Sequence, residues 1–269
     1  MVERRQLVEG VRGLLGGLLS PGSALDDPRA FYEAGYTQPD AAEAERLGRW
    51  RALGARSKAA HVRALCSRTG LQPRTMVEIG CGDRALLAAL RGLAPVFDGF
   101  ELSAPAAELA RRAVPDARRI EPFDGASVPA EDGAYDLAIL SHVLEHVPVP
   151  GPLLAEAARV AREVIVEVPL EDNRSAARPA KRAEAASIGH LHCFSRAAVR
   201  ELVDGAGLVR EAELTDPLPR EHHAFFASTP AARAAATAKW GVRAAAHRVA
   251  PRSCEAWFTV HYAVLARRP

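Results

Sequence analysis

The chain has 269 residues, 48% of them hydrophobic and 25% charged, which is enough to build a full α/β core with helical additions. The net charge is +2 and the 35 lysines and arginines are dispersed, so a nucleic-acid-binding surface is not expected. Four widely spaced cysteines form no Cys-x-x-Cys pair, and no apolar run is long enough to span a bilayer. We therefore expect a soluble, cytoplasmic protein without a membrane partner.

The first part of the chain, residues 1–70, reads as mainly helical and is predicted to form a lid or cap segment. A turn is expected near Pro21-Gly22-Ser23, and a second helix from Ala41 to Cys66, where apolar residues recur at spacings of three to four. Residues 71–269 are predicted to form the main domain.

From residue 75 onward, strand and helix patterns alternate. Strands are predicted at residues 76–79, 96–102, 118–122, 137–141 and 164–168, and helices at residues 84–91, 104–113 and 152–161. This alternation predicts an α/β fold with a parallel sheet covered by helices on both faces. Right-handed crossovers between parallel strands would make that sheet doubly wound.

The end of the chain has a different pattern. Residues 195–205 are predicted as a helix ended by glycine, and residues 208–214 and 257–266 as strands. An insertion at residues 215–250 is expected on the substrate side, and its alanine-rich part from Pro230 to Val249 should be helical. Residues 171–194 are predicted to include a lid loop, with no secondary structure assigned to residues 171–188.

The most informative segment is Val77-Glu78-Ile79-Gly80-Cys81-Gly82-Asp83. Gly80 and Gly82 allow backbone angles that are closed to other residues, so a strand can turn sharply into a helix against a ligand. Ala85 completes the pattern Gly-x-Gly-x-x-Ala and Glu101 follows about 20 residues later, which formally matches a dinucleotide fingerprint. The glycine pattern alone does not choose between cofactors.

Charge around the glycines favours one cofactor. Glu78 precedes the glycines and Asp83 follows them, and two carboxylates at this turn would repel a pyrophosphate. S-adenosylmethionine carries a sulfonium and an ammonium group and no phosphate, so acids are favourable there. The sequence therefore predicts S-adenosylmethionine rather than a nicotinamide dinucleotide.

This glycine segment resembles motif I of the class I S-adenosylmethionine-dependent methyltransferases. Phe100-Glu101-Leu102-Ser103 looks like the end of the second strand, whose acid in that family bonds the ribose hydroxyls. Phe123-Asp124 looks like the position whose acid contacts the adenine amino group, and residues 135–147 look like the fourth strand with its following loop. The resemblance covers roughly residues 30–212. It implies a Rossmann-like, seven-stranded, mostly parallel sheet whose last strand is antiparallel.

The resemblance also implies a set of cofactor-binding residues: Glu78, Gly80, Cys81, Gly82, Glu101, Leu102, Phe123, Asp124, Ser141, His142 and Tyr36. Alternatives stay open for some of them. Asp124 could cap a turn before Gly125, and Leu102 and Phe123 could be core residues or walls of an adenine pocket. Tyr32 and Tyr36 could close over the cofactor or pack against a neighbouring helix.

Three histidines are candidate catalytic residues: His142, His190 and His192. His142 follows the fourth strand, and an ordinary histidine pKa near 6.5 suits a general base at neutral pH. His190 and His192 share one face if their segment is extended, where they could bind substrate, act as base or hydrogen-bond buried backbone. In the resembled family, Leu144-Glu145-His146 is largely structural.

No metal is predicted. His142 and His146 are four residues apart, as in a zinc-binding helix, but the glutamate that should directly follow the first histidine is missing.

The expected function is methyl transfer to an oxygen, nitrogen or carbon atom of a small molecule, such as a secondary metabolite or a sugar. A monomer or homodimer with no nucleic-acid partner is expected. The alternative is a protein of the same fold that binds S-adenosylmethionine without methylating, because fold does not fix function.

Overall fold

The computed structural model describes residues 27–269, and the turn predicted near residues 21–23 lies outside this range. Seven strands of the described chain form one sheet in the order β3-β2-β1-β4-β5-β7-β6. Their bounds are β1 Thr75–Ile79, β2 Val96–Glu101, β3 Arg119–Pro122, β4 Tyr135–Ser141, β5 Ala161–Pro169, β6 Val209–Asp216 and β7 His261–Arg267. The strands β1 to β5 are mutually parallel, whereas β7 runs antiparallel to both β5 and β6. The predicted doubly wound sheet with an antiparallel last strand is confirmed.

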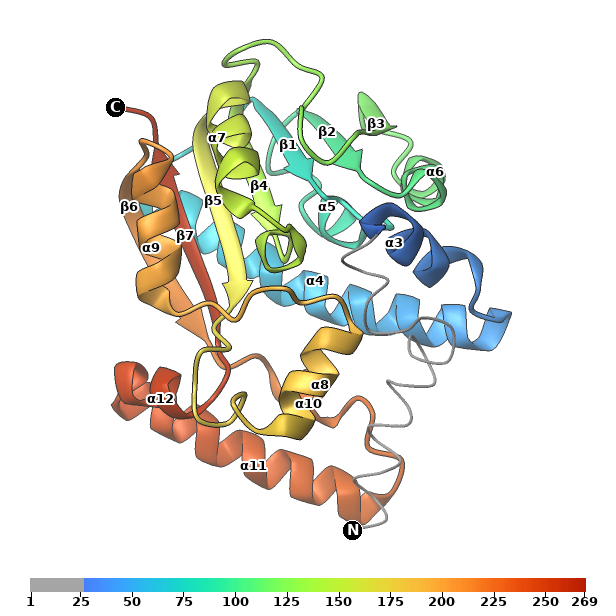
Figure 1. The fold of residues 1–269 in the computed structure, drawn as a ribbon, viewed down its shortest axis with the longest axis vertical. Coiled ribbons are helices and arrows are strands. Elements are labelled where there is room, and N and C mark those ends of the chain that lie inside the picture. The colour runs from blue at the N-terminus through green and yellow to red at the C-terminus, as the bar shows by residue number, and fades with distance from the viewer. Residues whose placement is uncertain (1–26) are drawn as a thin grey trace.

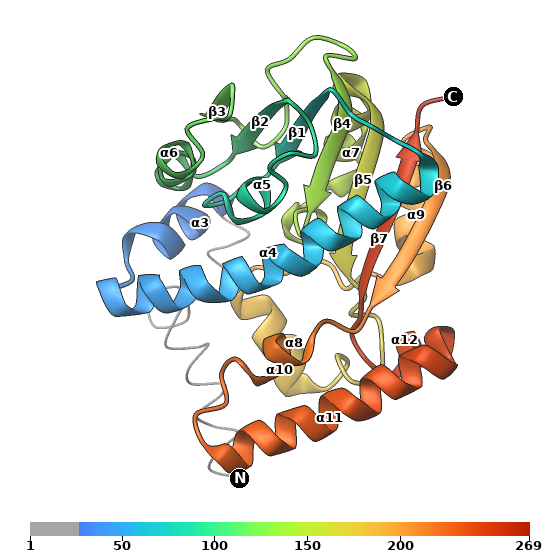
Figure 2. The same cartoon turned by 180° about the vertical axis from the view of Figure 1, so that it is seen from behind.

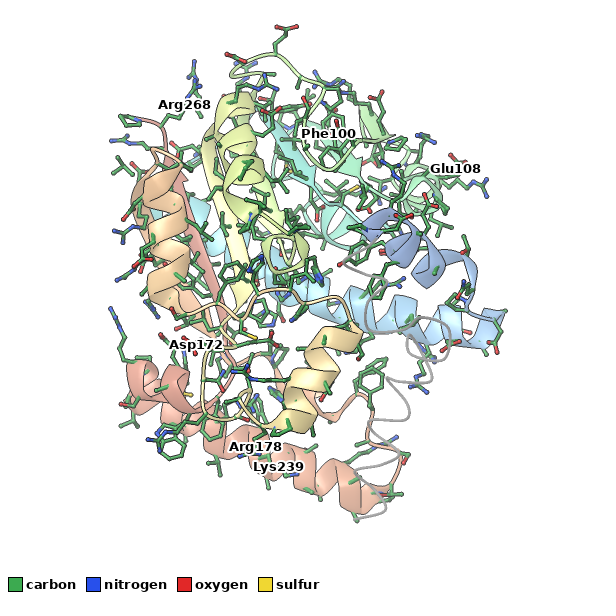
Figure 3. All side chains as sticks on the ribbon, viewed as in Figure 1. Phe100, Glu108, Asp172, Arg178, Lys239 and Arg268 are labelled. Atoms are coloured by element: carbon green, nitrogen blue, oxygen red, sulfur yellow. The ribbon has the colours of Figure 1, made fainter. Side chains whose placement is uncertain are left out.

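Helices cover both faces of the sheet (Figures 1 and 2). On one face lie α4 (Ala41–Thr69), α5 (Ala85–Ala89) and α6 (Ala104–Ala113), whose buried residues pack with Met76, Leu137 and Ile165. On the other face lie α7 (Pro150–Val160) and α9 (Arg196–Gly205), which pack with Phe100, Leu140 and Val166. Figure 3 shows Phe100 in the interior and Glu108 on the outer surface of α6.

Side-chain caps explain several helix ends. The carboxylate of Asp40 accepts a hydrogen bond from the Glu43 amide at the start of α4, and the hydroxyls of Ser103 and Ser195 do the same at the starts of α6 and α9. At the end of α4, Gly70 takes a φ of 75°, a left-handed conformation that favours glycine.

The structure differs from the predicted elements in two places. The last strand begins at His261 rather than at residue 257, because residues Pro251–Trp257 form α12, which begins with proline at the first helical position. Within residues 171–188, where no element was assigned, Pro179–Ser187 form α8. The predicted alanine-rich helix is confirmed as α11 (Pro230–Val249).

The remaining elements lie near the carboxyl ends of the parallel strands. They are α3 (Pro28–Thr37), the short 3-10 helix η1 (Leu144–His146) and α10 (Arg220–Ala224). Helices α8, α10, α11 and α12 gather beyond the carboxyl end of β5 (Figure 1). This is the edge at which open α/β sheets bind their ligands. Within residues 27–269, no helix combines the length and apolar character needed to cross a bilayer.

A buried carboxylate stabilises the sheet away from that edge. Asp98 on β2 is fully buried and accepts hydrogen bonds from Arg118 (2.5 Å), Arg119 (3.0 Å) and the Tyr135 hydroxyl (2.5 Å). Burial alone would raise the pKa of Asp98, but these donors outweigh it and lower the pKa. Asp98 therefore joins β2 and β3 to the first residue of β4.

We expect Asp98→Asn to lower the free energy of unfolding by about 2 to 3 kcal/mol, because hydrogen bonds to a charged group are lost. Denaturant unfolding measures this. Since the folded-state pKa is lowered, the stabilisation is present above the unfolded pKa of about 3.9 and is lost as the pH falls further. The difference between the two proteins should therefore shrink in acid. Asp116→Asn, at an exposed pair with Arg91, should change stability little, and an equal loss in both variants would contradict this role for Asp98.

Candidate active site

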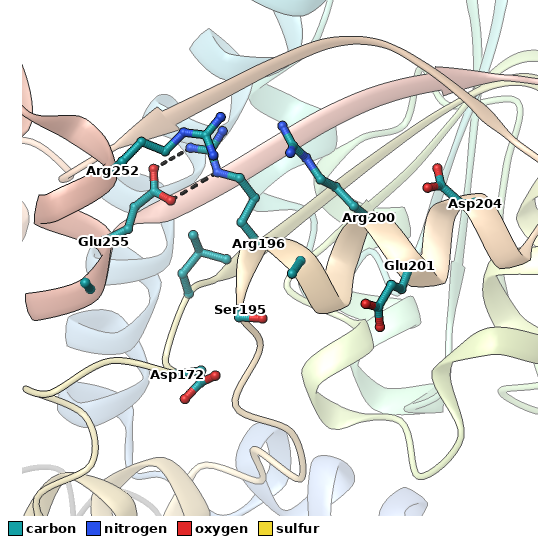
Figure 4. A pocket seen from close by; sticks show the side chains of 11 residues that line it. Asp172, Ser195, Arg196, Arg200, Glu201, Asp204, Arg252 and Glu255 are labelled. Carbon is teal, nitrogen blue, oxygen red and sulfur yellow. Dashed lines mark hydrogen bonds and ion pairs between the residues drawn. The ribbon is translucent and has the colours of Figure 1, made fainter.

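Two hollows in the described part of the protein are candidate ligand-binding sites. The first is a groove of about 510 Å³ between α9 and α12, shown in Figure 4. Its Arg196 pairs with Glu255, and its Arg200 pairs with Glu213 at 2.5 Å, so these charges neutralise one another. The groove contains none of the predicted site residues.

The second hollow is a cavity of about 420 Å³ at the carboxyl ends of β1, β2 and β4. It is covered by α3 and contains eight of the predicted site residues. The lining consists of Asp27, Pro28, Arg29, Tyr32, Tyr36, Gly80, Gly82, Glu101, Leu102, Phe123, Asp124, Gly125, His142, Val143, His146, Val147, Pro148 and Leu153. We take this cavity as the candidate active site.

The glycine turn forms one wall of the cavity as predicted. Gly80 has a φ of 78° and Gly82 a φ of 55°, both in the left-handed region. A Cβ atom on Gly80 would lie 2.6 Å from Cγ2 of Val143, and one on Gly82 would lie 3.1 Å from the Tyr36 hydroxyl. Gly80 therefore requires glycine for space as well as for conformation, whereas at Gly82 the left-handed backbone is the main requirement.

Glu101 at the end of β2 holds this turn in place. One carboxylate oxygen accepts a hydrogen bond from the Gly82 amide at 2.7 Å, and the other accepts one from the Ser103 amide at 3.0 Å. Burial raises the pKa of Glu101, although these two amides oppose the rise. Among the described residues no arginine or lysine lies within ion-pair distance of Glu101, so its charge is directed at the cavity.

Two acids used in the cofactor argument are placed differently. Glu78 is buried on the side of β1 that faces α4 and α5 and does not line the cavity; burial raises its pKa well above the usual range. Asp83 pairs with Arg51 of α4 at 2.8 Å, and that guanidinium also lies over the Tyr36 ring. The acids that face the cavity are instead Asp27, Glu101 and Asp124.

Two more predicted residues lie outside the cavity lining. The Cys81 sulfur points at β2, since a Cβ on Gly99 would lie 2.9 Å from it, and the Cys81 amide donates to the Phe100 carbonyl. The Ser141 hydroxyl donates to the Glu167 carboxylate at 3.2 Å. Both side chains are therefore engaged behind the cavity wall.

On the opposite wall, Leu102, Phe123 and Asp124 all line the cavity. The turn alternative for Asp124 is confirmed: one carboxylate oxygen accepts from the amides of Ala126 (2.8 Å) and Ser127 (2.7 Å). These amides lower the pKa of Asp124. Its contact with an adenine amino group stays a prediction. The second carboxylate oxygen makes no hydrogen bond within residues 27–269.

Helix α3 supplies the cover of the cavity. Tyr32 and Tyr36 both line it, and Tyr36 also packs against Arg51 of the neighbouring helix α4, so closure of these rings over a ligand stays a prediction. Arg29 was missed by the sequence argument; it lines the cavity and donates to the Phe123 carbonyl at 3.1 Å. This contact joins the cover to the wall that carries Asp124.

His142 lines the cavity but is not arranged as a base. Its Nε2 lies 3.1 Å from Nδ1 of His261, and its Nδ1 lies 3.1 Å from a carboxylate oxygen of Glu145. Burial is the main cause that lowers the pKa of His142 well below its usual range. Both ring nitrogens of His142 therefore lie close to protein groups.

His190 and His192 are not part of the cavity lining. Nδ1 of His190 donates to the Glu171 carboxylate at 2.7 Å, and this partner outweighs burial and raises the pKa of His190. Nε2 of His192 donates to the carbonyl of Val147 at 2.9 Å. Of the alternatives predicted for His192, the structure shows the hydrogen bond to a backbone carbonyl.

His146 is the histidine that sequence reasoning assigned to a structural role. It lines the cavity, its ring lies 5.5 Å from that of Tyr32, and its Nδ1 donates to the Gly189 carbonyl at 3.1 Å. Burial lowers its pKa to about 4. The backbone contact fixes the proton on Nδ1 and leaves Nε2 with its lone pair. Only its position four residues after His142 was visible in the sequence.

Comparisons with known proteins agree with this geometry. A family model described as a methyltransferase domain matches residues 49–213, more than half of the chain. A ubiquinone biosynthesis O-methyltransferase of Thiobacillus denitrificans is 28% identical over 102 residues, covering 36% of this chain and 43% of that protein. The chain thus matches less than half the length of this relative.

Solved structures share the fold. The geranyl diphosphate C-methyltransferase of Streptomyces coelicolor A3(2) superimposes with a TM-score of 0.60 at 16% identity, covering 91% of this chain and 98% of that one. The [4+2]-cyclase SpnF superimposes with a TM-score of 0.54 at 19% identity, covering 92% and 93%. With the matched methyltransferase domain and this sheet order, the chain belongs to the class I S-adenosylmethionine-dependent methyltransferases, as its motifs predicted.

Proposed function

We propose that this protein binds S-adenosylmethionine in the cavity under α3 and transfers its methyl group to an oxygen, nitrogen or carbon atom of a small molecule. The observation that carries this proposal is the Glu101 carboxylate, which borders the glycine turn and has no cationic partner in the described chain. A buried carboxylate suits ribose hydroxyls and a cationic sulfur compound, and it repels a pyrophosphate.

The cavity walls fit the parts of such a cofactor. Leu102 and Phe123 offer apolar surfaces to a flat adenine ring, and the unbonded oxygen of Asp124 can accept from its amino group. Gly80 and Gly82 let the backbone approach the sugar and methionine portions. Each of these roles rests on placement around one cavity, and each is a prediction for a complex.

A small acceptor agrees with the size and cover of the cavity. The cofactor and the acceptor must share about 420 Å³ beneath α3, whose Tyr32 and Tyr36 form part of the lining. We propose that α3 acts as the cap expected from residues 1–70. Methyl transfer is an in-line displacement, so holding the acceptor behind the methyl carbon and excluding water supplies most of the catalysis.

For an acceptor that keeps a proton, we assign the general base to His146. It is the cavity-lining histidine whose Nδ1 is fixed by backbone and whose Nε2 is unbonded in the described chain. A pKa of about 4 makes His146 a weak base, yet one that is unprotonated throughout the neutral range. Of the expected bases, His142 has both ring nitrogens close to protein groups, and His190 and His192 do not line the cavity.

The alternative, a protein that binds the cofactor without methylating, keeps one supporting observation. The [4+2]-cyclase SpnF has the same fold, so the fold does not decide the reaction. Release of S-adenosylhomocysteine separates the two functions.

We expect S-adenosylhomocysteine to accumulate when the protein is incubated with S-adenosylmethionine and a panel of small phenols, amines and allylic compounds. His146→Gln should lower kcat by about 100-fold or more if proton removal is part of the step, with cofactor affinity unchanged. His247→Gln, on α11 and bonded to Thr215, is the matched control and should keep full activity.

The pH profile tests the same assignment. Because the pKa of His146 is lowered to about 4, the base is already unprotonated at pH 5, and kcat should stay level between about pH 5 and pH 8. A fall in kcat with a midpoint near pH 6.5 would show an unperturbed histidine and exclude His146. Failure of S-adenosylmethionine to bind at all would contradict the proposed function itself.

Gly80→Ala should weaken binding of S-adenosylhomocysteine by about tenfold or more, because the new Cβ would lie 2.6 Å from Val143 at the cavity wall. Gly92→Ala is the matched control: Gly92 has a φ of 79°, close to that of Gly80, but nothing lies within 4 Å of its Cβ position. Calorimetric titration compares them. Equal affinities in the two variants would show that the glycine turn does not contact the cofactor.

A further inference from the structure

Three potential metal ligands, His142, Glu167 and His261, meet beside the cavity. Glu167 is near the end of β5, His261 is the first residue of β7, and His142 follows β4. One ligand atom from each residue lies within 4.8 Å of the other two. The three strands are adjacent in the sheet, so residues far apart in sequence are brought to one edge.

The sheet register explains the convergence. Glu167 pairs with Ala263 and Pro169 pairs with His261, so Glu167 and His261 are diagonal neighbours on one face of β5 and β7. The His142 amide donates to the Glu167 carbonyl at 2.8 Å, which fixes the start of the loop after β4. Glu167 is fully buried and His261 is 8% exposed, so the arrangement is held inside the protein.

The distances fit a bound ion. Nε2 of His142 lies 3.1 Å from Nδ1 of His261, which lies 3.3 Å from a carboxylate oxygen of Glu167. A tetrahedral ion with bonds of about 2.1 Å separates its ligand atoms by about 3.4 Å. Two imidazoles and one carboxylate form a donor set typical of zinc and non-haem iron.

Outer partners contact two of the three groups, His142 and Glu167, as is usual at metal sites. Nδ1 of His142 lies 3.1 Å from a carboxylate oxygen of Glu145, and neither buried oxygen of that carboxylate accepts a hydrogen bond within residues 27–269. The Glu167 carboxylate accepts from Ser141 at 3.2 Å and from Nδ1 of His61 at 3.0 Å.

The same network extends outward. Nε2 of His61 donates to Asp216 at 3.0 Å. His61 thus lies between the two carboxylates of Glu167 and Asp216, with one ring nitrogen against each.

The backbone supports a constrained site. His142 has a φ of 59°, uncommon for a residue other than glycine, and such strain concentrates at functional positions. Because His142 lines the cavity, an ion bound at its Nε2 would lie next to the acceptor space. In the sequence, only the spacing of His142 and His146 resembles a metal-binding pattern. The partners of His142 in this cluster lie instead on β5 and β7.

We propose that His142, Glu167 and His261 bind one divalent transition-metal ion, of the zinc and iron(II) class, with an open coordination position toward the cavity. The rival arrangement is a metal-free chain in which His261 shares its Nδ1 proton between His142 and Glu167. The proposal does not depend on methyl transfer.

The test uses the full chain freed of metal by a chelator and titrated with Co²⁺ and with Zn²⁺. We expect one ion per chain, a visible Co²⁺ absorption band of a site with few ligands, and a calorimetric Zn²⁺ signal. His61→Gln, which removes an outer partner, should weaken binding by about 10-fold to 100-fold. His261→Ala and Glu167→Gln should weaken binding more than this.

Controls distinguish neighbouring explanations. His247→Ala removes a histidine that bonds Thr215 and none of the three proposed ligands, and it should leave Co²⁺ binding unchanged. A second cluster, Glu145 with His146 and His190, lies nearby. If His190→Ala abolishes Co²⁺ binding while His261→Ala does not, the ion lies in that second cluster and the proposal is wrong.

Wild-type crystals soaked in Zn²⁺ decide the question if a variant fails to fold. An anomalous peak between His142, Glu167 and His261 supports the site. A peak elsewhere, or none at saturating Zn²⁺, overturns it and leaves the shared-proton chain. S-adenosylhomocysteine binding, measured on the same samples, reports separately on the proposed function.

Discussion

One carboxylate fixes the geometry on which the candidate site depends. Glu101 accepts a hydrogen bond from the Gly82 amide with one oxygen and from the Ser103 amide with the other. It thereby joins the glycine turn after β1 to the start of α6 across neighbouring strands. With the turn held, Gly80 and Gly82 keep the left-handed conformations that open the cavity beneath α3. The same carboxylate is buried and lines the cavity.

The charge of the cavity lining depends on which acids are paired with arginines. Asp83 pairs with Arg51 and Asp98 pairs with two arginines, so their charges are compensated inside the protein. Glu101 has amide partners only, and Asp124 keeps one oxygen unbonded. A hydrogen bond from a neutral amide leaves the net charge of a carboxylate in place, whereas an arginine cancels it. The preference for a cationic, phosphate-free cofactor therefore rests on fewer acids than the sequence suggests.

Local patterns predicted most of the fold. Two helices have the bounds predicted from the sequence, residues 104–113 and 230–249. Their ends could be predicted because capping residues and prolines act within a few residues of the helix end that they determine. The last strand was predicted too early, since aromatic residues around 257 fit a strand while Pro251 begins a helix.

The site was predicted less completely than the fold, for a physical reason. Gly80, Glu101 and Asp124 belong to short motifs whose roles depend on nearby residues, and all three reach the cavity. The partners of His142 come from β5, β7 and η1, and no local pattern joins His142 to His261. Whether a histidine has a free nitrogen depends on such distant contacts, so His142 and His146 could not be ranked as bases from spacing alone.

The most direct measurement is a calorimetric titration of S-adenosylhomocysteine into the wild-type protein and Glu101→Gln. Gln keeps one acceptor but loses the charge, so affinity should fall by about 1 to 3 kcal/mol, or roughly 5-fold to 150-fold. Glu121→Gln on the neighbouring strand β3, outside the cavity, should bind like wild type. Unchanged affinity in Glu101→Gln, or NAD binding in the same cavity, would contradict the account.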